Sequence, residues 1–218
     1  MAGRFQDRRE AGRMLAGAVA KLGLADPVVL ALPRGGVPVA YEVARALHAP
    51  LDVLLVRKLG APFQKEFGIG AIAEGTDPIV LLDDQLVRAV APPPGYVEEE
   101  IAREMTEMAR RRARYAAARQ PLKVAGRTVV LVDDGIATGG TARVALLALR
   151  RRGAARVVLA VPVAASASVA ALRGDADEVV CVLAPERMNA VGNYYVDFSP
   201  TPDQEVVDLL GEARPSSV

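Results

Sequence analysis

The chain has 218 residues, 51% of them apolar, and a formal net charge of +1 at pH 7. This length and composition predict a single domain over residues 1–218 with a full hydrophobic core. The balance of acids and bases excludes a global field that would draw the chain to nucleic acid or to a membrane surface. Cys181 is the single cysteine, so an internal disulfide is excluded. The N-terminus lacks the apolar run of a signal peptide and no stretch reaches membrane-spanning length, so we expect a cytoplasmic protein.

Strands and helices alternate along most of the predicted chain. The strand predictions are Val28–Leu32, Val53–Arg57, Thr128–Val132, Arg156–Val163 and Glu178–Leu183. The helix predictions between them are Val37–Leu47, Thr141–Arg152 and Ser166–Leu172. The strands are rich in Val and Leu and barely alternate, as expected when both faces of a sheet are covered. The order predicts a parallel sheet flanked by helices, with ligands beyond the carboxyl ends of its strands.

A long charged helix over Tyr96–Arg119 interrupts this alternation. The pairs Glu99–Arg103 and Glu107–Arg111 have the i,i+4 spacing that supports a helix. The cluster Arg110–Arg114 is either a solvated face paired with glutamates, which the spacing favours, or an anion-binding patch. His48 lies at the end of a predicted helix, where a structural role is expected.

The segment Thr128–Thr141 carries the chemistry. A buried strand ends at Val132, two carboxylates follow at Asp133 and Asp134, and a loop rich in small residues leads into a helix. Glycines let backbone N–H groups approach a ligand, and the helix N-terminus adds a positive dipole end. This pattern predicts a phosphate cradle beside two acids that face sugar hydroxyls. The alternative is a plain strand–turn–helix junction; neither a P-loop nor a dinucleotide-binding glycine motif is present.

Val129–Thr141 resembles the phosphoribosyl pyrophosphate (PRPP) signature of the type I phosphoribosyltransferases. The resemblance implies an α/β fold with a mostly parallel twisted sheet flanked by helices, with a core over about 24–183. It also implies a small hood from 1–23 and 184–212, beside an inserted helical segment at about 84–120. Asp133 and Asp134 would hold the ribose hydroxyls. The 5′-phosphate would lie against Gly135, Ala137, Thr138, Gly139, Gly140 and Thr141.

Two further segments are similar to parts of that family. Leu32–Pro38 resembles the pyrophosphate loop, in which the backbone N–H groups of Arg34, Gly35 and Gly36 and the Arg34 side chain would face pyrophosphate. Arg57–Lys58 follows a predicted strand where the family places a basic residue that reaches pyrophosphate, here Lys58. Leu59–Glu66 is either a mobile loop that closes over substrate or an ordinary solvated loop.

The tail Arg187–Phe198 is similar to the base-binding hood of purine salvage members. Met188 and Asn189 stand where an aromatic residue would stack on the base, and Asp197 would lie near the base. Tyr194 or Tyr195 is the alternative stacking platform, although core packing of both tyrosines is equally open. Ala137 replaces the acid–base aspartate of hypoxanthine-type enzymes.

The resemblance implies a nucleotide-salvage enzyme that transfers 5-phosphoribosyl from PRPP to a nitrogenous base, with Mg²⁺ as cofactor. Asp133, Asp134, Arg34 and Lys58 would form its catalytic set. No nucleic-acid or membrane partner is expected, and a homodimer is left open. The alternatives are a PRPP-sensing regulator without turnover and a plain sugar-phosphate-binding protein; Arg34 and Lys58 favour pyrophosphate handling over the latter.

Overall fold

The computed structural model describes residues 3–65, 67–75, 78–116 and 122–213. In chain order the elements are α1 (Arg8–Ala20), β1 (Val28–Ala31), α2 (Gly36–Ala46), β2 (Leu51–Val53), β3 (Val56–Gly60), β4 (Gly68–Ala73), β5 (Ile79–Leu82), α3 (Asp84–Val90), α4 (Tyr96–Ala116), β6 (Thr128–Val132), α5 (Gly140–Arg151), β7 (Arg156–Val163), α6 (Ser166–Leu172), β8 (Glu178–Leu183), the 3₁₀ turn η1 (Val191–Tyr194) and α7 (Asp203–Glu212).

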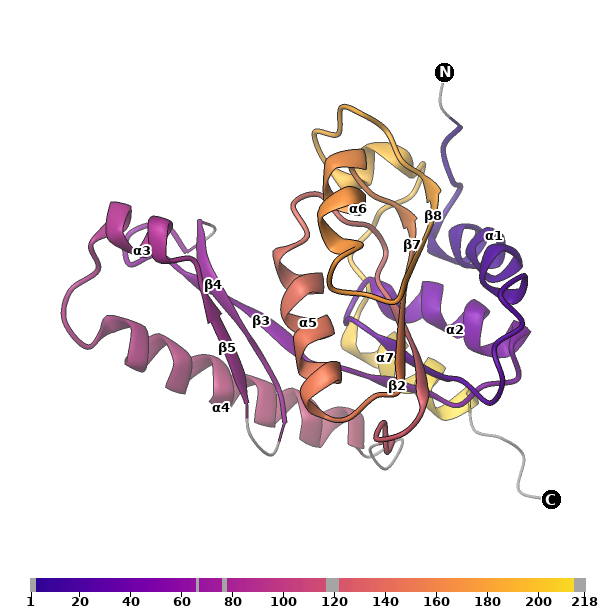
Figure 1. The fold of residues 1–218 in the computed structure, drawn as a ribbon, viewed down its shortest axis with the longest axis horizontal. Coiled ribbons are helices and arrows are strands. Elements are labelled where there is room, and N and C mark those ends of the chain that lie inside the picture. The colour runs from indigo at the N-terminus through magenta and orange to yellow at the C-terminus, as the bar shows by residue number, and fades with distance from the viewer. Residues whose placement is uncertain (1–2, 66, 76–77, 117–121, 214–218) are drawn as a thin grey trace.

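The main sheet is five-stranded and parallel, in the order β2-β1-β6-β7-β8. Helices α5 and α6 lie on one side of it and α1 and α2 on the other, with α7 beside α2 (Figure 1). Successive strand residues point into different cores: Val130 packs with the α1–α2 side, and Val129 and Leu131 pack with the α5–α6 side. Both faces are therefore covered, and the predicted fold class is confirmed.

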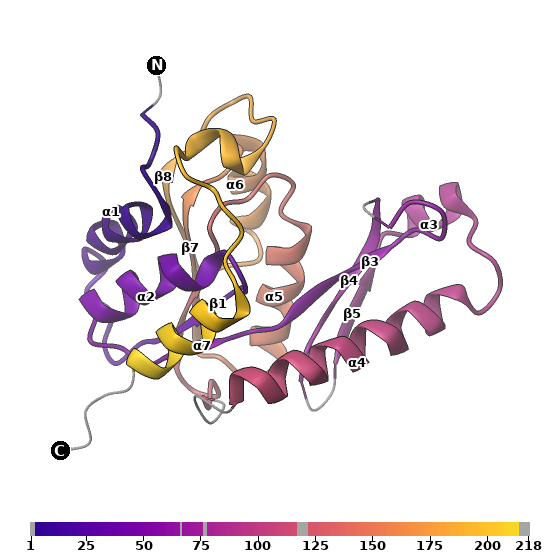
Figure 2. The ribbon, with the colours of Figure 1, turned by 180° about the vertical axis from the view of Figure 1, so that it is seen from behind.

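The described residues from Val56 to Ala116 form an arm that projects from the main sheet (Figures 1 and 2). It consists of the antiparallel sheet β3-β4-β5 with α3 and α4. The predicted strand Val53–Arg57 is wrong, because the chain changes sheets inside it. The amide of Leu54 donates to the carbonyl of Ala31 in the main sheet, whereas the carbonyl of Leu55 accepts from Glu74 of the arm. Both leucines are buried, so the apolar run gave no sign of the change.

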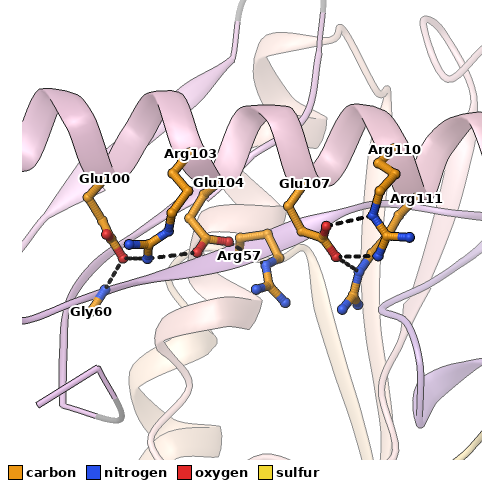
Figure 3. A network of polar contacts seen from close by, with 8 residues as sticks. All are labelled: Arg57, Gly60, Glu100, Arg103, Glu104, Glu107, Arg110 and Arg111. Carbon is orange, nitrogen blue, oxygen red and sulfur yellow. Dashed lines mark hydrogen bonds and ion pairs between the residues drawn. The ribbon is translucent and has the colours of Figure 1, made fainter.

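Helix α4 is fastened along β3 by the polar contacts of Figure 3. Nε of Arg57 donates to Glu104 at 2.6 Å, and the amide of Gly60 donates to Glu100 at 3.4 Å. The predicted long helix is confirmed up to Ala116, and residues 117–119 of that prediction lie outside the described residues. Arg103 pairs with Glu100 and Glu104 instead of the predicted Glu99.

The Arg110–Arg114 cluster is neutralised by acids. Arg110 and Arg111 both pair with Glu107 (Figure 3), each at a distance of 2.8 Å. Arg114 lies 3.2 Å from Asp203. Arg112 is largely enclosed and contacts Asp52 and Glu74, which ties α4 to the base of the arm. The paired-face interpretation therefore describes this cluster better than an anion patch.

The N-terminal segment (residues 3–7) lies beside the tail segment (residues 184–202). Phe5 forms a β-bridge with Tyr195, and the amide of Asp197 donates to the carbonyl of Gln6 at 2.8 Å. Helix α1 belongs instead to the layer that covers the main sheet, where it packs on α2, β7 and β8. None of the helices in the described residues combines the length and the hydropathy that crossing a bilayer would require.

Candidate functional site

Two loops meet at the carboxyl edge of the main sheet. Strands β1 and β6 pair in register up to Ala31 and Val132, and the amide of Leu32 donates to the carbonyl of Val132 at 2.8 Å. A Cβ at position 36 would lie 2.9 Å from that carbonyl, and a Cβ at position 35 would overlap Oδ2 of Asp134. Only glycine allows this approach. The sheet thus brings the predicted pyrophosphate loop against the predicted ribose acids.

The β1–α2 loop differs in detail from its prediction. The peptide bond between Pro33 and Arg34 is cis. The N–H of Gly36 donates to the carbonyl of Leu32 at 3.1 Å, because Gly36 begins helix α2. Gly36 therefore contributes close packing instead of the expected donor for pyrophosphate. The side chain of Arg34 is exposed. The hydrogen bond from Tyr115 lowers the pKa of Asp203 at the start of α7, and the charge of Arg34 contributes a smaller lowering.

Asp133 and Asp134 form a pair of neighbouring acids. The amide of Asp134 donates to Oδ1 of Asp133 at 2.9 Å. Burial, followed by the charge of Asp134, raises the pKa of Asp133 well above its ordinary value. Burial also raises the pKa of Asp134, although a hydrogen bond from Arg8 opposes that change. Two half-buried carboxylates with raised pKa values at a loop edge are typical of a functional site.

Asp134 is held from both ends by residues that sequence reasoning missed. Nε of Arg8 donates to its carboxylate Oδ2 at 2.8 Å. The hydroxyl of Tyr195 donates to its backbone carbonyl at 2.6 Å. The pair Asp7 and Glu10 carries a capping-box signal that would have predicted helix α1 from Arg8 onward. No local signal connects Arg8 with Asp134, 126 positions away.

The β6–α5 loop is the segment that the sequence predicts to cradle a phosphate. Its base is fixed to β7 and α6: the amide of Ile136 donates to Val163 at 2.9 Å, and Oγ of Ser168 donates to the carbonyl of Ala137 at 2.6 Å. Gly139 has φ +84°, a left-handed conformation that favours glycine. Helix α5 begins at Gly140, so the unpaired N–H groups of its first turn lie in this loop.

The rim of the cradle faces solvent. Ala137, Thr138, Gly140 and Thr141 are exposed. Gly135 is instead packed under the tail segment, where a Cβ would overlap the side chain of Val191. The arrangement offers a rigid, open backbone loop at a helix N-terminus, which suits a phosphate group.

Comparison with known proteins settles the family. The family model for the phosphoribosyl transferase domain matches residues 5–198. The chain belongs to the phosphoribosyl transferase domain family. A Mycobacterium tuberculosis H37Rv protein, named provisionally as a phosphoribosyl transferase, is 48% identical over 210 residues. That match covers 96% of this chain, and this chain spans about half of that relative, 47% of its length.

Solved structures agree with the fold of this phosphoribosyl transferase domain. The protein TT1426 from Thermus thermophilus is 47% identical, with a TM-score of 0.82, and the alignment covers 97% of this chain and 100% of that one. The AQ2163 protein from Aquifex aeolicus is 16% identical, with a TM-score of 0.50 and coverage of 85% and 78%. The second likeness bears on the fold alone.

The basic residues after β2 occupy the start of the arm of this phosphoribosyl transferase domain. The side chain of Arg57 forms an ion pair with Glu104 on α4. Lys58 is exposed on β3 opposite Ala71, and its aliphatic chain lies against Gly68, where a Cβ would overlap it. The predicted loop Leu59–Glu66 begins inside β3, which ends at Gly60. Phe63 in the following turn is 94% exposed, and Glu66 lies outside the described residues.

The tail residues differ from the predicted base platform. Tyr195 is buried, with its ring centroid 5.4 Å from that of Phe5 and 5.0 Å from that of Phe198, so it cannot stack on a base. Its hydroxyl holds the acid pair instead. The hydroxyl of Tyr194 donates to the carbonyl of Arg187 at 3.2 Å.

Three further tail residues have separate surroundings. Met188 packs against the hydrophobic cluster that contains Phe5 and Tyr195, and Asn189 is exposed. Asp197 accepts hydrogen bonds from the amide and hydroxyl of Ser199.

Proposed function

We propose that this chain is a phosphoribosyltransferase, which transfers the 5-phosphoribosyl group of PRPP to a nitrogenous base and releases pyrophosphate. The observation that carries the proposal is the contact between the two loops at the carboxyl edge, where Gly35 lies directly against Asp134. A ligand there would meet a phosphate cradle, two sugar-facing acids and a cationic loop together. PRPP carries the complementary groups: a 5′-phosphate, a ribose and a pyrophosphate.

Each part of PRPP has a proposed set of contacts. The 5′-phosphate lies against the loop from Ala137 to Thr141, with hydroxyl donors from Thr138 and Thr141. Asp133 and Asp134 accept hydrogen bonds from the ribose hydroxyls. The N–H groups and guanidinium of the β1–α2 loop at Arg34 and Gly35 bind pyrophosphate, and Lys58 adds charge from the start of the arm.

Mg²⁺ is the proposed cofactor, and PRPP itself offers the oxygens that suit it. No three His, Cys, Asp or Glu side chains gather into a metal cage in the part of the chain that the structure describes. Mg²⁺ commonly keeps few protein ligands and binds through substrate oxygens. Here diphosphate and ribose oxygens of PRPP would hold the ion, while Asp133 and Asp134 face the ribose hydroxyls. The bound ion would neutralise charge on the pyrophosphate.

In the proposed reaction, the bond between C1 of ribose and the pyrophosphate oxygen breaks, and its electron pair leaves with pyrophosphate. A ring nitrogen of the acceptor forms the new bond to C1 and loses its proton. The transition state carries positive charge on the sugar ring. The chain contributes by orienting the two reactants and by stabilising negative charge on the leaving group beside Arg34.

One observation favours a second candidate, a PRPP-sensing regulator without turnover. Tyr195 is buried, and the ring of Phe198 is covered by the guanidinium of Arg8 at 4.0 Å. A standard purine would lose about 1–3 kcal/mol of stacking without an aromatic platform. Within the transferase proposal, the same observation favours an acceptor other than a standard purine.

The test is a PRPP-consumption screen against a panel of bases, combined with calorimetry of PRPP binding in the presence of Mg²⁺. The panel contains adenine, guanine, hypoxanthine, xanthine, uracil and orotate, together with other ring-nitrogen acceptors. PRPP binding with pyrophosphate release on one acceptor supports the transferase. Tight PRPP binding without release on any acceptor favours the regulator, and no PRPP binding excludes both.

A further inference from the structure

We propose that Arg8 is a positioning residue for PRPP, which holds the carboxylate of Asp134 in place so that its second oxygen can accept a hydrogen bond from ribose. The inference rests on the proposed function, because it concerns the same ligand. Arg8 lies outside the two motifs that define the site, at the first turn of α1.

The guanidinium of Arg8 is enclosed on several sides. Its Nε contacts Oδ2 of Asp134 at 2.8 Å, and Nη1 donates to the carbonyl of Ser199 at 2.7 Å. The ring of Phe198 lies beneath it, 4.0 Å from Cζ. Only 11% of the Arg8 side chain is exposed. An arginine held by three different groups has one orientation, so it can fix the position of its carboxylate partner.

Oδ2 of Asp134 is enclosed between two elements. Arg8 approaches it from α1, and the backbone of Gly35 packs against it from the β1–α2 loop. Both of these contacts fall on Oδ2, while the Asp134 side chain as a whole keeps 15% exposure. The other oxygen, Oδ1, is the one that we assign to the ribose hydroxyl.

The charges around this contact are unequal. Asp133 lies beside Asp134 on the same loop, so two half-buried acids share one neighbouring guanidinium. From the tail segment, the neutral hydroxyl of Tyr195 contacts the Asp134 backbone, and Asp197 lies within electrostatic reach of Arg8. Arg8 lowers the pKa of both members of the pair. Its removal would let the pair take up a proton, and a protonated carboxyl is a poorer acceptor for a hydroxyl group.

The experiment measures PRPP dissociation constants by calorimetry with Mg²⁺ from pH 5.5 to 8.5, for wild type, Arg8→Ala and Arg8→Lys. At neutral pH we expect roughly 10- to 100-fold weaker binding by Arg8→Ala, the range of a charge-assisted hydrogen bond. The loss should grow as the pH falls and shrink as it rises. Titration of the PRPP phosphates is common to all the proteins, so it cancels in the ratio. Arg8→Lys keeps the charge and should restore the pH midpoint with partial affinity.

The matched control is Arg13→Ala, five residues along α1, where the arginine is 55% exposed and 3.9 Å from Glu42. It should bind PRPP as wild type does. A second readout needs no ligand: a carbon-13 NMR titration of the aspartate carboxyls should show the acid pair titrating at higher pH in Arg8→Ala. If Arg8→Ala fails to fold, both the PRPP dissociation constant and the carboxyl titration are measured on Arg8→Lys instead.

The outcomes separate the two proposals. If wild type binds PRPP and both Arg8 variants match it at every pH, the positioning role is wrong and the proposed function stands. A loss of affinity that is constant with pH, with unchanged carboxyl titration, would also overturn the positioning role. If wild type does not bind PRPP, the proposed function fails and this inference fails with it.

Discussion

The hydroxyl of Tyr195 donates a hydrogen bond of 2.6 Å to the backbone carbonyl of Asp134, across 61 positions of sequence. The ring of Tyr195 is buried between Phe5 and Phe198, so the hydroxyl has a fixed direction. Burial raises the pKa of Tyr195, which keeps the hydroxyl protonated as a donor. The tail segment thus supports the acid pair from behind.

Tyr195→Phe should lower the free energy of unfolding by about 1–3 kcal/mol, because it leaves the Asp134 carbonyl without this donor. PRPP binding should weaken as well, since the acid pair loses a support. Denaturant unfolding and calorimetry check the two effects. The control is Tyr194→Phe, whose partly exposed hydroxyl makes a longer bond, and which should change stability by less than about 0.5 kcal/mol. Equal effects of the two variants would contradict the prediction.

Asp133→Asn should abolish PRPP binding and leave the protein at least as stable as wild type. The amide oxygen can still accept the hydrogen bond from the Asp134 amide. Because the pKa of Asp133 is raised in the folded state, native protein binds more protons than unfolded protein above the ordinary pKa of about 4. The free energy of unfolding of the wild type therefore falls as the pH rises from the ordinary pKa of Asp133 to its raised pKa in the folded protein.

The asparagine variant lacks this loss, so its stability advantage should grow with pH and vanish in acid. Thermal unfolding at several pH values measures the advantage. An advantage that grows toward acid would show that Asp133 is stabilised as a carboxylate instead.

Gly139→Ala should cost about 1–2 kcal/mol of stability, because it places a side chain at φ +84°. The added Cβ would also lie 3.2 Å from Leu172. Gly140→Ala is the matched variant: nothing lies within 4 Å of its Cβ, so stability should be unchanged. Both should weaken ribose 5-phosphate binding, measured by calorimetry. Unchanged affinity of both variants for ribose 5-phosphate would show that the phosphate does not bind at this loop.

Arg34→Ala should weaken pyrophosphate and PRPP binding roughly 10- to 100-fold while sparing ribose 5-phosphate, since the lost contact involves pyrophosphate alone. Competition calorimetry with the three ligands gives the comparison. Arg57→Ala serves as the control, because that side chain is already paired with Glu104 on α4. If Arg34→Ala weakens all three ligands equally, the division of the site is wrong.

The sequence predicted what is locally encoded. The strand ending at Val132, the acids after it and the helix from Gly140 are continuous in the chain. One segment therefore predicted both a strand of the main sheet and the candidate phosphate loop. The arm sheet was missed because β4 reads Gly-Ile-Gly-Ala-Ile-Ala, in which glycines and alanines outnumber the two isoleucines and no clear alternation is seen. Its glycines allow close packing: a Cβ at Gly70 would meet the carbonyl of Leu81 at 2.5 Å. The packing of β5 against Gly70 depends on the folded structure, so the sequence alone did not reveal it.

The roles of Arg8 and Tyr195 could not be predicted for a similar reason. Arg8 is one of several arginines near the N-terminus, and its neighbour Arg9 pairs with Glu42 at 3.3 Å on α2 instead. Residue type and spacing do not distinguish the two. The distinction comes from α1 packing against the main sheet, which turns Arg8 toward the carboxyl edge.

The bridge between Phe5 and Tyr195 has a consequence for the order of folding. Arg8 contacts the carbonyl of Ser199 across 191 positions, and Arg4 contacts that of Asn193 across 189. Contacts between such distant positions carry the largest loop-closure entropy and tend to form late. A ribosome-bound chain that has already folded β1 and β6 would still lack the support of Asp134 until Tyr195 emerges. We therefore expect nascent chains to acquire PRPP affinity in one late step, after most of the main sheet has become protease-resistant.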